Sequence, residues 1–465
     1  MARRKRHTPP FDVHLDRMGP SGCSLGEHEG KTIQVRSAPP GSTVHVAPFK
    51  VKQGVMHARR VNMVEPPPDL QTPPCAMFGL CGGCAFQEIS LDAQRQAKHE
   101  RVLRLVPPGP NTQVLPVAGA PAAYGYRNKV ELSFGVRCYL TEADNDAGKT
   151  IHGTFLGFHA PGRFDRVVDA ERCELADPKM NAALAGVRKW WGENPLAPWD
   201  VREHTGFLKH LVLRASTLGQ VLIAVYTAEP TTPEQQAAME SLAGFVEADS
   251  VLWYVNPRVA DAAIGDLRQV LAGKTTIDEA LGDVRYQLSA TAFFQTNTPG
   301  AVVLYDLIGQ ALGPGERLLD LYCGTGAIGL YLGDRYEKVL GIEMNPAAVE
   351  DAVQNAERNG RTQVHYIAGK VEDNLPQLQP GDVAVVDPPR AGLHPKVAKF
   401  LAKSALTSLV YVACKPESLA RDRLVFEENG WELELLQTVD LFPQTGHIEV
   451  IARFVRPSSS FNEAE

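Results

Sequence analysis

A cysteine and two acidic residues stand at positions where a folded α/β domain places its reactive side chains. Cys414 follows the apolar run SLVYVA and precedes a proline in VACKPESLARD. Asp387 follows DVAVV in DPPRAGLH, and Glu449 begins the last apolar run in HIEVIARFVRP. Ligands in such folds bind beyond the carboxyl ends of the strands. A thiolate and a carboxylate that face one site suit covalent addition to a substrate followed by removal of a proton.

The sequence around Cys414 favours its reactive form. A helix is expected to begin just after it, and Lys415 is adjacent, so both the helix N-terminus and the lysine would stabilise a thiolate. The alternative is an inert core cysteine, which is the commoner role of this residue type. Its place beyond the strand and before a proline argues for a side chain that faces the binding site.

A glycine pattern marks a second ligand-binding segment. Gly324, Gly326 and Gly329 have the spacing G-x-G-x-x-G in LLDLYCGTGAIG, at the end of one expected strand and the start of a helix. Glu343 ends the next expected strand, about 20 residues on, where an acidic side chain can accept hydrogen bonds from ribose hydroxyls. This combination favours a cofactor that contains adenosine. The segment alone does not decide between NAD and S-adenosylmethionine.

Three cysteines form a compact motif, Cys75-x5-Cys81-x2-Cys84, which needs a fourth ligand from elsewhere in the chain. Four thiolates suit either a tetrahedral zinc ion or a [4Fe–4S] cluster, and the spacing does not choose between them. No apolar run approaches the roughly 18 residues of a membrane helix, and no signal peptide is recognisable. We therefore expect a cytoplasmic protein with reduced cysteines.

The elements that must position these residues fall into three predicted domains. Residues 291–465 alternate short apolar runs with helical stretches, which predicts a parallel, doubly wound sheet closed by an antiparallel strand pair at one edge. Residues 67–290 mix strands and helices. Residues 1–66 contain short strand-like runs between Gly and Pro turns, which predict a small antiparallel barrel.

Charge is distributed unevenly between these domains. The whole chain has a net charge of −7, which argues against a uniformly basic nucleic-acid-binding protein. Residues 1–66, however, hold eleven Lys and Arg against five Asp and Glu, a net charge of +6, so the remainder carries −13. This asymmetry fits a basic module that supplies affinity for phosphate, although a solvated basic face would look the same.

Taken in order, the motifs resemble one family, the TRAM-domain, iron–sulfur 5-methyluridine RNA methyltransferases of bacteria. The turns MGPSG and PPGSTV resemble the TRAM domain, an OB-like RNA-binding barrel, and FGLCGGCAFQEISLDAQRQAK resembles the cluster segment. YGYRNKVELS resembles the central domain, and FFQTN, LDLYCGTG, DPPRAG, CKPESLARD and TGHIE follow in the family's order. The resemblance implies a multidomain α/β protein: TRAM barrel, mixed α+β central domain with a cluster loop, and a C-terminal class I, Rossmann-like methyltransferase domain.

The resemblance also implies roles for individual residues. Cys414 would add to carbon 6 of a uracil, S-adenosylmethionine would methylate carbon 5, and Glu449 would remove the carbon-5 proton. A structural [4Fe–4S] cluster would be held by cysteines, and the cofactor by a second set of residues. The implied cluster ligands are Cys75, Cys81, Cys84 and Cys173, and the implied cofactor-binding residues are Gln295, Tyr322, Gly324, Glu343 and Asp387.

Three positions depart from the family pattern. Ala413 and Lys415 flank the nucleophile where Ser and Asn are usual, and Ala327 replaces an Asn near the glycines. The expected partner is RNA, with 23S ribosomal RNA as the first expectation and transfer RNA as the alternative, and the protein is expected to be a monomer that binds no membrane. A non-catalytic RNA-binding or ribosome-assembly factor is a hypothesis from another class. An NAD-dependent oxidoreductase would leave the Cys–Glu pair and the cysteine motif unexplained.

Overall fold

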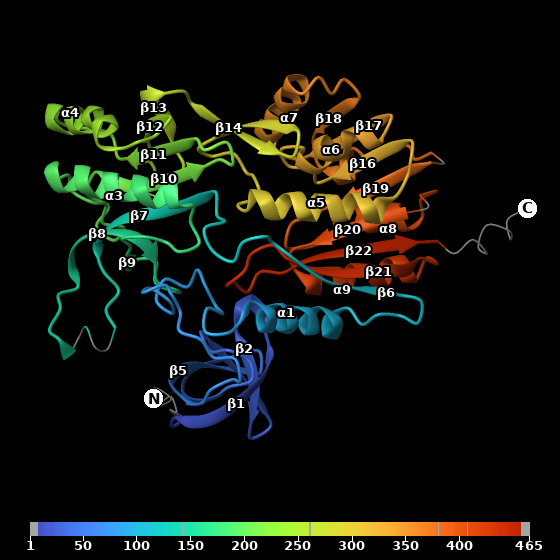
Figure 1. The fold of residues 1–465 in the computed structure, drawn as a ribbon, viewed down its shortest axis with the longest axis horizontal. Helices are drawn as coiled ribbons and strands as arrows, with labels where there is room; N and C mark the ends of the chain where they lie inside the picture. The colour runs from blue at the N-terminus through green and yellow to red at the C-terminus, as the bar shows by residue number, and fades with distance from the viewer. Residues whose placement is uncertain are drawn as a thin grey trace, which may run out of the picture. The chain divides into compact units, whose positions relative to one another are not determined.

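The computed structural model describes residues 8–456, apart from positions 142, 143, 145, 260, 261, 380 and 407. The chain divides into two compact units (Figure 1). The first unit comprises Met1–Pro73, Cys84–Ala123 and Pro299–Glu465, and the second comprises Pro74–Gly83 and Tyr124–Thr298. In the described part of the chain, no helix combines the length and the apolar character needed to cross a bilayer.

The N-terminal part of the first unit is a closed five-stranded barrel in the order β1-β2-β3-β5-β4. Its strands are β1 (Phe11–Met18), β2 (Ser24–His28), β3 (Lys31–Arg36), β4 (Thr43–Lys52) and β5 (Val55–Glu65). Alternate residues such as Val13, Leu15, Ile33 and Val35 point inward and form its core. The barrel is therefore as predicted, except that β3 and β5 pair in parallel and not antiparallel.

The C-terminal part of the first unit contains an eight-stranded sheet in the order β18-β17-β16-β19-β20-β22-β21-β6. The strands from this region are β16 (Arg317–Leu321), β17 (Lys338–Glu343), β18 (Val364–Ala368), β19 (Asp382–Val386), β20 (Ser408–Ala413), β21 (Glu432–Asp440) and β22 (Glu449–Val455). The first five in spatial order are parallel, and β22 pairs antiparallel with both β20 and β21. The prediction of a parallel sheet with an antiparallel strand pair is confirmed.

Helices connect these strands and pack on the sheet, which explains why the strand residues are largely apolar. The connecting helices are α5 (Thr298–Leu312), α6 (Ala327–Leu332), α7 (Pro346–Arg358), α8 (Pro395–Ala402) and α9 (Pro416–Glu427). Pro346, Pro395 and Pro416 each occupy the first turn of a helix, where a missing N–H costs nothing. Helices α7 and α9 start within three residues of the ends of β17 and β20, whereas α8 starts after the loop 387–394.

The last strand of this sheet comes from far away in the sequence. β6 (Gln113–Gly119) pairs in parallel with β21, so β21 is not the edge strand that the sequence suggested. Helix α1 (Leu91–Leu105) precedes β6 and contacts β6, β21 and α9, as Figure 1 also shows. Residues 84–123 thus pack with the first unit, whereas the predicted boundaries assigned them to the central domain at 67–290.

The second unit is built on a seven-stranded sheet in the order β13-β12-β11-β10-β7-β8-β9. Its strands are β7 (Lys129–Arg137), β8 (His152–His159), β9 (Val167–Asp169), β10 (Leu208–Ala215), β11 (Val221–Thr227), β12 (Ser250–Val255) and β13 (Asp266–Gly273). Helices α3 (Pro178–Glu193) and α4 (Pro233–Ser241) and a two-stranded sheet of β14 (Thr276–Leu281) and β15 (Val284–Ser289) complete it. Trp190 and Trp253 are fully buried in its core.

Candidate active site

Strand register brings the predicted nucleophile and base together. Cys414 directly follows Ala413, the last residue of β20, and Ala413 pairs with Val450 of β22. Glu449 precedes Val450 and is the first residue of β22. Because β20 and β22 are antiparallel neighbours, the residue after the end of one lies beside the first residue of the other. Cys414 and Glu449 therefore stand next to each other at one edge of the sheet.

Asp387 follows β19, which lies directly beside β20, and belongs to the same edge. Burial raises the pKa of the Asp387 carboxyl group to about 7. Glu449 is buried too, and burial together with the nearby Asp387 raises its pKa well above the usual range. A carboxylate whose pKa is raised is a stronger base than an ordinary carboxylate.

The electrostatic surroundings of Cys414 differ from those expected. Burial, followed by the charges of Glu449 and Asp387, raises the pKa of the thiol to about 11. Lys415 is exposed and is not among the groups that shift this pKa. The expectation that Lys415 and the helix N-terminus favour a thiolate is not met, because burial and the two acidic neighbours raise the pKa of the thiol instead. At neutral pH the half-buried thiol is mainly protonated.

Arg390 is the cation that opposes these acidic groups. Its charge and a hydrogen bond lower the pKa of Cys414, and its charge also lowers that of Glu449. Its Nη2 lies 3.3 Å from Nδ1 of His447, in the loop before Glu449. The motif DPPRAG thus supplies both an acid and a cation to one site. Sequence reasoning quoted this motif but gave Arg390 no role.

The glycine segment forms a tight turn between β16 and α6. Gly324 and Gly326 have φ values of +55° and +73°, in the left-handed region that favours glycine. Glu343 at the end of β17 fixes this turn: its Oε2 accepts a hydrogen bond from the Gly324 N–H at 3.2 Å. Its Oε1 accepts a second hydrogen bond, from the Asn345 N–H at 2.7 Å. The acid predicted to face a ribose is thus tied to the glycine turn.

Asp320 is a buried acid that sequence reasoning missed. It lies on β16, and its Oδ2 accepts a hydrogen bond from the Gly329 N–H at 2.8 Å. Its Oδ1 has no hydrogen-bond partner among the described residues, although the side chain is fully buried. Burial raises its pKa to about 7. The available signal was a single acidic residue inside the otherwise apolar run LLDL.

These features fit S-adenosylmethionine. An unsatisfied buried polar atom costs about 1–3 kcal/mol of stability. A ligand that donates a hydrogen bond to Oδ1 of Asp320 would remove this cost. A Cβ placed on Gly324 would meet no atom within 4 Å, which leaves open space beside the turn. Asp320, Gly324 and Glu343 together could therefore hold the amino-acid and ribose parts of the cofactor.

Tyr322 and Gln295 belong to different parts of the chain. Tyr322 lies between β16 and the glycine turn with a φ of +65°, and its hydroxyl accepts a hydrogen bond from the His394 N–H at 3.4 Å. Gln295 belongs to the second unit, where its carbonyl oxygen accepts a hydrogen bond from Asn128 Nδ2 at 2.9 Å. Only Tyr322 is thus placed in the same unit as the glycine turn.

The predicted cluster ligands are divided between the units. Cys75, Cys81 and Cys173 belong to the second unit. Burial, and after it the nearby Cys173, raises the pKa of the Cys75 thiol, and burial together with Cys75 and Cys173 raises that of Cys81. Cys84 belongs to the first unit. All eight cysteines are among the described residues, and no disulfide joins any of them. Among the described residues, no group of three or more His, Cys, Asp or Glu is arranged to hold a metal ion.

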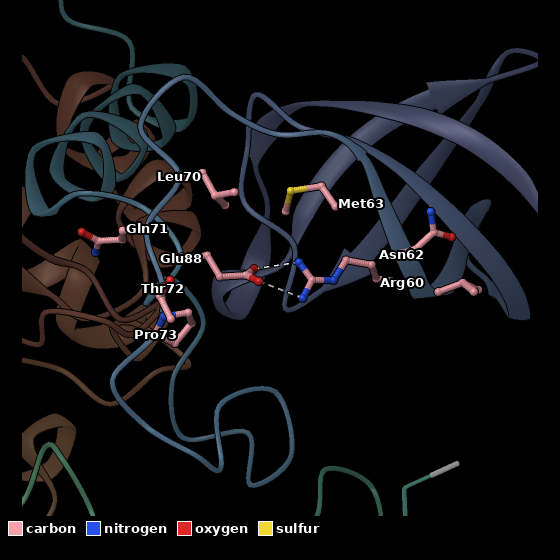
Figure 2. A pocket seen from close by; sticks show the side chains of 9 residues that line it. Arg60, Asn62, Met63, Leu70, Gln71, Thr72, Pro73 and Glu88 are labelled. Carbon is pink, nitrogen blue, oxygen red and sulfur yellow. Dashed lines mark hydrogen bonds and ion pairs between the residues drawn. The ribbon is translucent and has the colours of Figure 1, made fainter. Parts of the chain in front are cut away.

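A pocket of about 370 Å³ lies elsewhere in the first unit and contains none of the predicted site residues (Figure 2). It is lined by β5 and the segment after it, and Arg60 forms two hydrogen bonds with Glu88, at 2.7 and 2.9 Å. Met63 and Leu70 point toward each other across it in Figure 2. The pocket combines apolar and polar walls at the base of the barrel.

Substitution of the two turn glycines should separate cofactor binding from folding. A Cβ on Gly326 would lie 2.3 Å from the Tyr366 hydroxyl, so Gly326→Ala should lower the free energy of unfolding by about 2 kcal/mol or more. Gly324→Ala adds backbone strain of only about 1–2 kcal/mol. It should nevertheless weaken binding of S-adenosylhomocysteine about tenfold or more by filling the open space. Calorimetry measures the binding of S-adenosylhomocysteine, and thermal unfolding measures stability. Unchanged binding by Gly324→Ala would show that the cofactor does not approach this turn.

The raised pKa of Cys414 predicts a particular pH dependence. Below a pKa of about 11 the thiolate fraction rises about tenfold per pH unit. Alkylation of Cys414 by iodoacetamide, followed by peptide mass spectrometry, should therefore accelerate up to about pH 10 without a plateau. Arg390→Met should slow the reaction, and Lys415→Met should leave it unchanged as the matched control. A plateau near pH 8 would contradict this account.

Several known proteins are similar to this chain. A family model described as a methyltransferase domain matches residues 312–416. An uncharacterized RNA methyltransferase of Chlorobaculum tepidum is 37% identical over 433 residues, covering 90% of each chain. Another, from Caldanaerobacter subterraneus, is 33% identical and covers 94% of this chain and 97% of its own.

A solved structure is similar along nearly the whole chain. It is the Pyrococcus abyssi tRNA (uracil-54, C5)-methyltransferase in complex with S-adenosyl-L-homocysteine, which is 26% identical with a TM-score of 0.76. The match covers 96% of this chain and 100% of that one. With relatives this similar over nine-tenths of its length, the protein belongs to the family of S-adenosylmethionine-dependent RNA methyltransferases.

Proposed function

We propose that this protein methylates carbon 5 of a uridine in RNA through a covalent adduct with Cys414. The observation that carries the proposal is the strand register that sets Cys414 beside the buried Glu449, with Arg390 next to both. Methyl transfer to a nitrogen or oxygen atom needs no such pair. Carbon 5 of uracil does, because it is a poor nucleophile until a thiolate adds to the neighbouring carbon.

The addition step belongs to Cys414. After the thiol releases its proton to solvent, Sγ forms a bond to carbon 6 of the ring, and the electron pair of the 5,6 double bond moves toward carbon 5 and the carbonyl group. Arg390 favours this step, since its positive charge offsets the two carboxyl groups that otherwise raise the pKa of the thiol. Carbon 5 becomes the nucleophile that accepts the methyl group; S-adenosylmethionine would supply it and leave as S-adenosylhomocysteine.

The elimination step belongs to Glu449. Once methylated, carbon 5 carries both a proton and the methyl group, and loss of the proton restores the double bond and breaks the Sγ–carbon 6 bond. Glu449 lies beside Cys414, and burial has raised its pKa, so its carboxylate is a stronger base than one in water. Asp387 contributes indirectly, because its charge raises the pKa of Glu449 further.

The barrel is the proposed RNA-binding surface. Phe49 and Val51 are 68% and 64% exposed on β4, and Lys50 and Lys52 alternate with them. An aromatic ring among lysines on an exposed strand suits unpaired nucleic acid, since bases stack on the ring while the lysines attract phosphates. The net charge of +6 on residues 1–66 supports the same partner.

Two RNA targets remain candidates. Ribosomal RNA of the large subunit follows from the resemblance of the motifs. Transfer RNA is favoured by a specific observation, the match to the Pyrococcus abyssi tRNA (uracil-54, C5)-methyltransferase over 96% of this chain. A covalent adduct retains its RNA, so sequencing the RNA bound to Cys414 would decide between them.

We propose further that Cys75, Cys81, Cys84 and Cys173 hold a structural [4Fe–4S] cluster in a monomeric enzyme. Support comes from the spacing of the motif and from the mutual proximity of the three thiols in the second unit.

Glu449→Gln should trap the intermediate. The amide keeps the shape of the side chain but cannot take the carbon-5 proton, so turnover should fall by about 100-fold or more. A methylated RNA–protein adduct, labelled from the methyl group of the cofactor and stable to denaturing electrophoresis, should accumulate. The double variant Cys414→Ala, Glu449→Gln should form none. Normal turnover by Glu449→Gln would assign the proton to another base, and turnover by Cys414→Ala would exclude the covalent route.

Metal analysis tests the proposed cluster. Protein purified without oxygen should be brown and contain about four irons per chain. Cys75→Ser and Cys173→Ser should lose the colour, whereas Cys138→Ser should retain it, because Cys138 is a buried cysteine outside the motif. Colourless protein with bound zinc would show that the four cysteines form a zinc site and not an iron–sulfur cluster.

A further inference from the structure

The loop at 441–448 connects β21 to β22 and ends at Glu449. Its position therefore sets where the proposed base begins its strand. Gln444, in the middle of the loop, is almost fully buried and has a φ of +69°, which is uncommon for a residue other than glycine. A side chain in such a conformation persists only where its surroundings hold it.

Gln94 of α1 holds Gln444 through a reciprocal pair of hydrogen bonds. The Gln94 Nε2 donates to Gln444 Oε1 at 2.9 Å, and the Gln444 backbone N–H donates to Gln94 Oε1 at 2.8 Å. Gln94 is fully buried and its Nε2 also lies 3.0 Å from the carbonyl oxygen of Ile89. These bonds join residues 350 positions apart in the sequence.

A second contact of α1 lies one helical turn further on. Lys98 is fully buried, and its Nζ donates to Asp440 Oδ1 at 2.5 Å and to the Phe442 carbonyl oxygen at 3.1 Å. Asp440 is the last residue of β21, so this contact fixes the beginning of the loop as Gln94 fixes its middle. Residues four apart on a helix share one face, which explains why a single face of α1 makes both contacts.

The segment before α1 and the barrel also contact the loop at 441–448. The Gln444 carbonyl oxygen accepts hydrogen bonds from the N–H groups of Ala85 and Phe86 at 2.8 and 3.1 Å. Gly446 is packed so tightly on the barrel that a Cβ there would lie 2.1 Å from the Gly22 nitrogen. Beyond Gly446, His447 contacts Arg390, the cation beside Cys414 and Glu449.

We infer that Gln94 is a positioning residue: through Gln444, it fixes the loop that places Glu449 and Arg390 around Cys414. The inference rests on the role proposed above for Glu449. It assigns α1 a part in the reaction, although none of its residues reaches the reacting atoms. Binding of RNA at the barrel would act on the same loop through Gly22 and Gly446.

Gln94→Met in the full-length protein tests this assignment. Methionine fills the same space but makes none of the hydrogen bonds. We expect kcat for methyl transfer to fall about tenfold or more, with KM for S-adenosylmethionine unchanged within about twofold, because displacement of a reacting group by about 1 Å can cost 100-fold. Part of the enzyme should accumulate as the RNA adduct, and amides of 444–449 should exchange hydrogen faster.

Gln96→Met is the matched control, because Gln96 is exposed on the same helix and bonds Glu100 four residues on. Gln444→Gly is a second test that adds no backbone strain, since glycine adopts the left-handed conformation readily. It should lower kcat as Gln94→Met does, and the double variant should lose no more than either single one.

Each outcome has a distinct meaning. Normal kcat in Gln94→Met and Gln444→Gly, or equal losses in Gln96→Met, would overturn the inference. A loss that appears only as a lower melting temperature, with no adduct and a normal kcat for the folded fraction, would overturn it as well. Failure of the unaltered protein to form 5-methyluridine would overturn the proposed function instead, and hydrogen exchange would still report whether Gln94 holds the loop.

Discussion

Burial of several acidic groups at one end of a parallel sheet is the constraint on which the site depends. Asp320, Asp387 and Glu449 all have raised pKa values, and all three also raise the pKa of the buried Tyr305 on α5. Carboxyl groups that are buried near one another cannot all be ionised without a counter-charge. Arg390 supplies one positive charge, and a sulfonium cofactor brings another. Occupation of the site is therefore expected to release protons, so that the acids become bases when the substrates are in place.

The same constraint explains which parts of the site were visible in the sequence. Cys414, Asp387 and Glu449 were identified because each borders an apolar run, and buried strands place such borders at one edge. The state of the Cys414 thiol was not predictable, because it depends on Glu449, which is distant in sequence and adjacent in space. Asp320 was missed because a buried acid inside an apolar run resembles an ordinary strand residue.

In the fold too, individual strands and helices were predictable from the sequence, whereas pairings between distant strands were not. Strands followed by helices were recognised from short apolar runs that alternate with helical stretches, as in residues 291–465. The pairing of β6 with β21 could not be predicted. Nothing in the sequence QVLPVAG indicates which strand it pairs with, and its partner lies more than 300 residues away. The parallel pairing of β3 and β5 in the barrel was missed for the same reason: alternation predicts strands but not their neighbours.

Insertion of β6 beside β21 has a consequence for synthesis of the protein. Thr112, just before β6, bonds the carbonyl oxygen of Leu433 on β21, and 321 residues separate them. At roughly 5–20 residues per second, β6 leaves the ribosome about 15 to 65 s before its partner exists. During that interval an unpaired strand is available for pairing with other chains. The nascent chain therefore depends on chaperones, or on the early folding of the barrel and α1, to shield β6 until translation is almost complete.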